Sequence, residues 1–239
     1  MVNLGKFVQD LLLWSTREFG FLRLSDGFVQ SSSIMPQKRN PVSLEHARIL
    51  ASRALGEAQA VLLCAHHTPF GDINDSEDPL QPLVFTMYAD ALRSLRLLAG
   101  VLTAAEVDCD HLAHCAASNF LTVTELADSL VRRTGMSFRE AHTLVARAVE
   151  ASGADDRPAA IAQVFLSQNP LLGVDQALVE RALDPRNFVR IRQVPGGPAP
   201  DVVAGALARA GAEQQEIEEW IRRKQEMLDA ARRENRAGI

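Results

Sequence analysis

The chain has 239 residues, of which 47% are apolar and only 5% aromatic, and its formal net charge is −5 at pH 7. This length can bury one large core or two small ones, and the apolar content excludes a disordered chain. The negative charge argues against a protein that binds nucleic acid by neutralising phosphates, and no apolar run is long enough to span a bilayer. Scarce aromatics with plentiful Ala and Leu favour packed helices over sheet.

The first half of the chain is predicted to consist of long helices. Apolar residues at spacings of three and four predict a helix over 2–19, which starts without an N-cap, so we expect the chain to begin inside a helix bundle. A turn at 25–27 separates it from helices over 41–65 and 78–104, which are joined by the polar loop 66–75. The apolar surface of the 41–65 helix is wide, which indicates burial among several others. Long helices in series predict part of an elongated bundle.

Shorter helices are predicted after Val107, so we place the domains at 1–106, a partial helical bundle, and 107–239, a small C-terminal helical domain. Thr122 with Glu125 and Ser137 with Glu140 have the spacing of capping boxes that open helices. Gly135 and the arginines before it fit a helix end. The remaining predictions are helices ending at 133 and 151, further helices over 158–167, 174–183, 201–210 and 213–235, and an irregular stretch over 187–200.

The cysteines point to a reducing environment. Cys64, Cys109 and Cys115 are an odd, scattered set in a chain without a secretory signal, so we expect reduced thiols and a cytoplasmic location. Cys109, His111, His114 and Cys115 lie close together, but their spacing fits no standard closed zinc site. We therefore expect no metal.

The most informative stretch is Ser-Ser-Ser-Ile-Met-Pro-Gln-Lys-Arg-Asn-Pro over 31–41, which we call the signature loop. Its two prolines exclude a helix interior. Its hydroxyls, its ammonium group and its amide can supply a base, a cation and a donor to carboxylates. A solvated loop between helices is the alternative that composition alone would allow.

The signature loop resembles the motif G-S-S-x-M-P-x-K-x-N-P of the fumarase/aspartase superfamily. Segments on both sides of the loop resemble argininosuccinate lyases in particular. These segments are 12–21, 124–133, 138–142 and 194–200. The resemblance implies an all-α fold and the C-terminal half of such an enzyme, a partial chain that lacks the N-terminal segments.

The same resemblance implies a lyase that cleaves L-argininosuccinate to L-arginine and fumarate by β-elimination, in arginine biosynthesis. The enzyme would use no cofactor, bind a small succinyl substrate and form a homotetramer at full length, without nucleic-acid or membrane partners. Ser32 matches the catalytic base, and Lys38 and Asn40 match substrate-contacting positions. Ser33 and Met35 fall with them on the substrate-binding loop, as neighbours that shape it.

Elementary chemistry agrees with these roles. Breaking a C–N bond beside a succinyl group needs a base for a weakly acidic C–H proton, a cation facing the new charge and an acid for the leaving nitrogen. A serine hydroxyl is a poor base unless donors or positive charge stabilise its alkoxide. Lys38 can provide that charge, and a helix starting near Pro41 would direct its positive end toward an anion.

The chain departs from the family pattern in three places. Ser31 replaces the usual Gly, the loop 68–75 lacks the usual Tyr/Gln/Lys set, and none of the six histidines lies in the family's Thr-Ser-x-His segment that carries the general acid. Two alternatives therefore stay open. One is another lyase of the superfamily, of adenylosuccinate or carboxymuconate type, and the other is a non-catalytic helical oligomer.

Overall fold

The fold is all-α. The structure, a computed structural model, describes residues 1–75 and 77–237, and within these ranges it has ten α-helices and four strands of two residues each. The chain divides into two compact units, Met1–Leu112 and Ala113–Ile239. Among the described residues, none of the helices combines the length and the apolar character that crossing a membrane requires.

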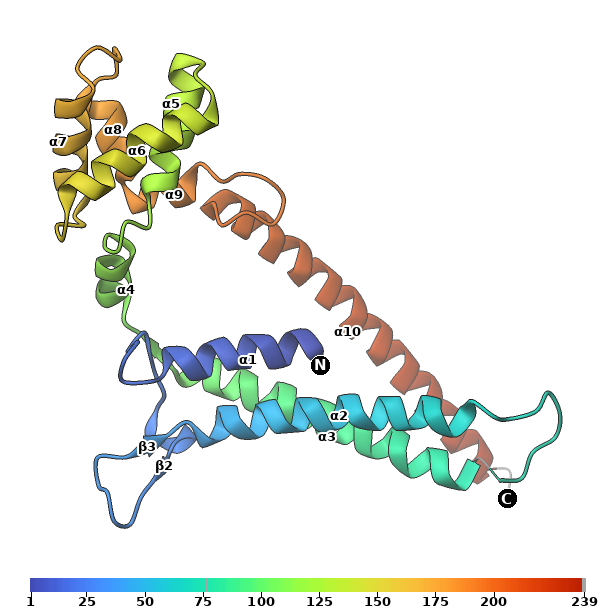
Figure 1. The fold of residues 1–239 in the computed structure, drawn as a ribbon. Helices are drawn as coiled ribbons and strands as arrows, with labels where there is room; N and C mark the ends of the chain where they lie inside the picture. Colours follow the sequence, from blue (N-terminus) through green and yellow to red (C-terminus); the bar gives the residue numbers. More distant parts are fainter. Residues whose placement is uncertain (76, 238–239) are drawn as a thin grey trace. The chain divides into compact units, whose positions relative to one another are not determined.

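Unit 1 is built on three helices, α1 (Val2–Trp14), α2 (Val42–Ala65) and α3 (Glu77–Ala104). α2 and α3 run antiparallel side by side, and α1 lies along α2 (Figure 1). The two long helices have the bounds that hydrophobic periodicity predicts to within one residue. Their shared core joins residues from α1, α2, α3 and the segment after α1, namely Val8, Leu11, Leu22, Leu24, Leu44, Ala47, Leu98 and Val101.

Helix α1 ends at Trp14 and not at residue 19, so this predicted boundary is wrong. The hydroxyls of Ser15 and Thr16 donate to the carbonyls of Leu12 and Leu13, at 2.8 Å each, and so compete with continued helical bonding. The chain then turns through Gly20 (φ +62°) into β1 (Leu22–Arg23), which pairs antiparallel with β4 (Glu106–Val107).

The expectation that α2 is buried on most sides is also wrong within unit 1. Its buried face is narrow because, among the described residues, α1 and α3 are its main helical neighbours, and Ile49, Leu55 and Leu62 remain exposed. The α2–α3 contact includes a buried polar bond, in which the Ser94 hydroxyl donates to the Ala47 carbonyl at 2.7 Å. This bond satisfies a hydroxyl that would otherwise be costly to bury.

Unit 2 contains the short helices that follow α4 (Cys109–Ala116), a helix in which the boundary between the units falls. The short helices are α5 (Val123–Thr134), α6 (Phe138–Ser152), α7 (Pro158–Gln168), α8 (Gln176–Leu183) and α9 (Pro185–Arg190), and they are followed by the long helix α10 (Pro200–Ala237). Helices α5 to α8 pack around Phe165, Leu126 and Leu130, which are fully buried (Figure 1). Helix α9 occupies the start of the stretch that the sequence suggested to be irregular.

One of the two predicted capping boxes forms. The Ser137 hydroxyl accepts the Glu140 backbone N–H, and the Glu140 carboxylate accepts the Ser137 backbone N–H, which confirms the box at α6. The Ser137 hydroxyl also donates to the Glu140 carboxylate at 2.8 Å. This bond, followed by the bond from the Ser137 backbone N–H, lowers the pKa of Glu140. At α5 the Thr122 side chain makes no capping bond because its backbone is already helical. The end of α5 at Gly135, which has φ +75°, is confirmed.

Replacing Ser137 with alanine is expected to lower the free energy of unfolding by about 1 kcal/mol, because the helix loses its N-cap acceptor. Thr122→Val is the matched control, since it removes a hydroxyl that makes no capping bond, and we expect a smaller loss than for the alanine variant of Ser137. Urea unfolding followed by circular dichroism measures both. Equal losses in the two variants would contradict the capping role.

The C-terminal region forms one helix where the sequence predicts two. α10 runs unbroken from Pro200 to Ala237 and passes through Gly211. A single glycine costs a helix about 1 kcal/mol. The alanines and long polar side chains around it favour the helix strongly enough to outweigh that cost.

Candidate active site

The signature loop forms a β-hairpin at the N-terminal end of α2 (Figure 1). Its arms are β2 (Gln30–Ser31) and β3 (Arg39–Asn40), which pair with Gln30 opposite Asn40 and Ser31 opposite Arg39. Residues 32–38 connect the two arms. The hairpin therefore places the predicted base, the predicted cation and the predicted amide in one short segment.

The Ser32 hydroxyl is held by the backbone of its own loop. Its oxygen accepts hydrogen bonds from the N–H groups of Ile34 and Met35, both at 3.2 Å. Two amide dipoles thus point at the oxygen, where they favour negative charge. The side chain is half-buried, so one side of it stays accessible.

The other predicted site residues lie around Ser32 in the same hairpin. Lys38, Ser33 and Met35 are exposed, and Asn40 is half-buried beside the start of α2. The Lys38 backbone N–H donates to the Met35 carbonyl at 3.0 Å, which closes the turn of the loop. Helix α2 begins two residues after Asn40, so the positive end of its dipole lies next to the hairpin.

Arg39 anchors the hairpin, a feature that the sequence analysis missed. Its guanidinium donates to the Asp26 carboxylate and, at 2.8 Å, to the Leu24 carbonyl. Asp26 belongs to a 3-10 helix, Asp26–Phe28. The hydrogen bond and the charge of Arg39 lower the pKa of Asp26. The sequence contains one signal for this pair, namely an arginine beside Lys38 and an acidic residue in the preceding turn.

A close contact with α3 also fixes the segment before the hairpin. The Phe28 ring lies so near Gly100 that a Cβ atom at this position would stand 3.1 Å from the ring. Glycine in a helix interior is otherwise unfavourable. Because Gly100 has no side chain, the Phe28 ring can reach the core of unit 1, against which it packs.

Ser31, which replaces the glycine of the family motif, causes no backbone strain in this conformation. It lies in β2 opposite Arg39. The non-glycine residues with positive φ among those described are Asn119 and Phe120. An ordinary L-residue therefore fits the hairpin arm.

The histidines lie in several places. His111 shares a hydrogen bond with the Phe19 carbonyl through Nε2 at 2.9 Å and lies against the Phe21 ring. The rings of His66 and His67 lie next to each other at the exposed end of α2, with centroids 3.6 Å apart and planes tilted by 40°. His46 is exposed on α2. No group of three or more side chains suited to hold a metal ion occurs among residues 1–75 and 77–237.

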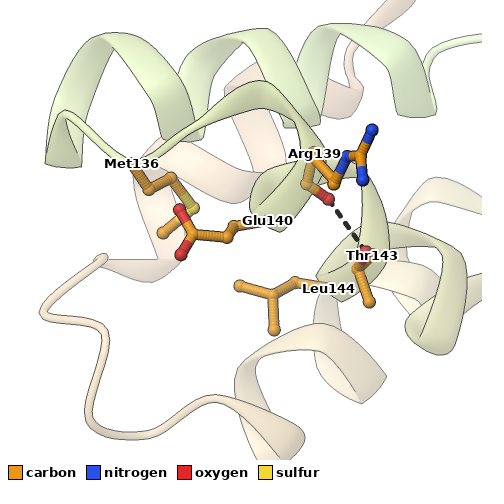
Figure 2. A pocket seen from close by; sticks show the side chains of 5 residues that line it. All are labelled: Met136, Arg139, Glu140, Thr143 and Leu144. Carbon is orange, nitrogen blue, oxygen red and sulfur yellow. Dashed lines mark hydrogen bonds between the residues drawn. The ribbon is translucent and has the colours of Figure 1, made fainter.

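A pocket of about 500 Å³ opens at the start of α6, formed by Met136, Arg139, Glu140, Thr143 and Leu144. Figure 2 shows the Thr143 hydroxyl turned toward the Arg139 carbonyl, to which it donates at 2.8 Å. The Glu140 carboxylate is engaged in the capping box with Ser137. The Thr143 hydroxyl and the Glu140 carboxylate therefore both make their hydrogen bonds to α6 or its N-cap.

A second pocket of unit 2, of about 520 Å³, lies beside a buried ion cluster. Glu125 is only 2% exposed, and its carboxylate is paired with Arg132 and, at 3.3 Å, with Arg192. The Ser129 hydroxyl donates to the same carboxylate at 3.0 Å. Two cations and a hydroxyl compensate the buried charge, so removing one partner of the cluster would leave a buried charge without compensation.

Comparisons with known protein families match both units. The family model described as "Lyase" matches residues 1–56, and the model described as "Argininosuccinate lyase C-terminal" matches residues 120–190. The first match contains the whole signature loop and its Asp26 anchor. The second contains the ion cluster except for Arg192, which follows shortly after it.

Two curated relatives show how much of a longer enzyme the chain covers. Argininosuccinate lyase 2 of Agrobacterium fabrum is 39% identical over 214 residues, which are 87% of this chain and 42% of the relative. Argininosuccinate lyase of Methanothrix thermoacetophila is 35% identical over 96% of this chain and 50% of the relative. The chain thus spans about half the length of the curated relatives it matches.

A solved structure agrees with these matches. The structure of an EDDS lyase variant with bound fumarate superimposes with a TM-score of 0.77 and 29% sequence identity, over 92% of this chain and 45% of that one. Fold, hairpin and sequence together define a member of the fumarase/aspartase superfamily. Within it, the chain belongs to the argininosuccinate lyase family and corresponds to the C-terminal half of its members.

Proposed function

We propose that this chain is the part of an argininosuccinate lyase that carries the catalytic base, and that the complete enzyme releases L-arginine and fumarate by β-elimination. The observation that carries the proposal is the Ser32 hydroxyl, whose oxygen receives two backbone N–H groups at 3.2 Å. Such donors supply the alkoxide stabilisation that a serine needs to act as a base.

In this proposal the Ser32 alkoxide removes a proton from the carbon next to the succinyl carboxylate. The electron pair left behind spreads into that carboxylate as an aci-carboxylate, and it then forms the fumarate double bond as the C–N bond breaks. The ammonium of Lys38 and the amide of Asn40 bind the carboxylates of the substrate, and Ser33 and Met35 shape the loop around it. A general acid protonates the leaving nitrogen. We assign that role to no residue of this chain.

The wider setting is part of the same proposal. We place the complete enzyme in arginine biosynthesis in the cytoplasm, as a homotetramer that acts on a small succinyl substrate. The bound fumarate of the EDDS lyase relative supports the fumarate half of the reaction. The names of the curated relatives support arginine as the other half.

A substrate comparison tests the function. The purified chain is assayed alone, and after mixing with the N-terminal half of the Agrobacterium fabrum relative, while fumarate release is followed by absorbance. We expect turnover of argininosuccinate in the mixture, with adenylosuccinate and EDDS at least about tenfold slower, because a site matched to one amine discriminates by transition-state contacts. If the mixture prefers either of the other substrates, arginine is not the amine that the enzyme releases. If none of the substrates is turned over, the lyase function is contradicted.

A further inference from the structure

The hairpin that carries the signature loop is too small to hold its own position. Its ladder consists of two residue pairs, and the connection between the arms is seven residues long. A two-stranded hairpin is marginally stable in water even with longer arms. A base in such a loop needs an anchor outside the hairpin if it is to meet a substrate at a fixed distance.

Arg39 makes that connection. One guanidinium nitrogen donates to the Asp26 carboxylate, and the other donates to the Leu24 carbonyl at 2.8 Å. Leu24 is itself part of the buried core of unit 1. The two bonds therefore tie β3 to backbone that the core already holds in place.

The same anchor sets the orientation of Asn40. Successive side chains of a strand point to opposite sides, so an Arg39 that is directed at Asp26 leaves Asn40 on the other side of β3. A slip of one residue would exchange the two positions. The cross-strand partner of Arg39 is Ser31, the residue directly before Ser32, so the position of the base depends on the same register.

We propose that Arg39 is a positioning residue for the lyase reaction, which it serves by bridging Asp26 and the Leu24 carbonyl and so fixing the hairpin register that places Ser32, Lys38 and Asn40. This inference rests on the proposed function, because it concerns the geometry of the same loop. The planar fork of arginine suits the task, since it donates in two directions at once. A lysine at this position can keep only one of the two bonds.

The bridge is charged at neutral pH. Arg39 lowers the pKa of Asp26, chiefly through the hydrogen bond and next through its charge. A carboxyl whose pKa is depressed in the folded state contributes above its unfolded pKa of about 3.9, and the contribution is lost as the pH falls through the folded value. Assays near pH 7 therefore examine the intact bridge.

Asp26→Ala is the sharpest test, because it removes the charged half of the Arg39 bridge, leaves only the bond to the Leu24 carbonyl, and does not alter the signature loop. We expect kcat for fumarate release to fall about tenfold to a hundredfold, with KM changed about threefold at most, because the catalytic groups are displaced while the substrate contacts remain available. Arg39→Lys should lie between wild type and Arg39→Ala. The double variant Asp26→Ala/Arg39→Ala should be no slower than Arg39→Ala alone, because Arg39→Ala already removes the bond that Asp26→Ala would break.

Limited trypsin digestion gives a readout that does not depend on activity. Asp26→Ala retains both cleavage sites of the hairpin, after Lys38 and after Arg39, and we expect faster cleavage there than in wild type. Asp10→Ala is the matched control, because Asp10 is an exposed carboxylate of unit 1 in α1, well before the hairpin in the chain. This control should change neither cleavage nor kcat.

The two readouts separate the two proposals. If wild type releases fumarate and Asp26→Ala retains its kcat, the positioning role of Arg39 is overturned, whether or not cleavage accelerates. Unchanged cleavage together with unchanged kcat would show in addition that the bridge does not hold the hairpin. If wild type turns over none of the substrates, the lyase function fails and the positioning role fails with it, while faster cleavage would still show that the bridge restrains the loop.

Discussion

Ser32→Ala is expected to lower kcat for fumarate release by about three orders of magnitude, the middle of the range for general acid–base catalysis. The reason is that no other group takes the place of the hydroxyl between the amides of Ile34 and Met35. The fold should persist, since Ser32 is half-buried in a hairpin and lies outside the core. Steady-state assays and circular dichroism of the same preparations measure both effects.

Ser33→Ala is the matched control for this variant. Ser33 is an exposed serine of the same loop, and its loss should cost about tenfold or less, as expected for a residue that shapes the loop and does not accept the proton. Activity of Ser32→Ala comparable to that of Ser33→Ala would remove Ser32 as the base.

Ser32→Cys distinguishes a base from a structural turn residue. An unperturbed thiol has a pKa of about 8.5, so partial activity that rises with pH as the thiolate forms would identify position 32 as the proton acceptor. If the cysteine variant is as inactive as the alanine variant at every pH, the hydroxyl is needed only for its hydrogen bonds in the turn. That outcome would contradict the assignment.

Glu125→Ala is expected to lower the free energy of unfolding of unit 2 by about 3 kcal/mol, the lower end of the cost of breaking a buried ion pair. The variant leaves Arg192, a largely buried cation, without its carboxylate. The value lies at the lower end because the Arg132 side chain is 58% exposed and can turn to water. Urea unfolding followed by circular dichroism measures the change.

Two further variants separate the charge of Glu125 from its shape. Glu125→Gln keeps an acceptor for Ser129 and the arginines, so its loss should be smaller than that of Glu125→Ala. Glu150→Ala, at an exposed position of the same unit, should change the free energy of unfolding by roughly 0.5 kcal/mol or less. A loss at position 125 as small as that at position 150 would show that the cluster does not stabilise the unit.

Hydrophobic periodicity was sufficient to predict the helices that have a core on one side. α2 and α3 have clear apolar spacings, and the structure places both close to their predicted bounds. The helix ends that were predicted wrongly depend on competition between local interactions. Hydroxyls of Ser15 and Thr16 end α1 early, and good helix formers continue α10 through Gly211.

The sequence was sufficient to identify the residues of the candidate site, but not the contacts that hold them in place. The motif identified Ser32, Lys38 and Asn40 as candidates, and their catalytic roles remain proposals. The Arg39–Asp26 bond joins residues thirteen positions apart across a strand pairing that no periodicity signals. The close approach of Phe28 to Gly100 depends on tertiary packing between distant segments. Hydrophobic periodicity indicates neither contact, and the only signal for the first is the arginine beside Lys38 with an acidic residue in the preceding turn.

The exposed position of Lys38 in the hairpin has a consequence for chemical labelling. Lys6, Lys38 and Lys224 are the only lysines of the chain, so an acylating reagent meets three side-chain amines and the N-terminal amine. Modification at residue 38 is readily separated from the other sites by peptide mass spectrometry. A succinyl compound that occupies the loop should slow acylation at this one position, so amine reactivity can report ligand occupancy without any turnover.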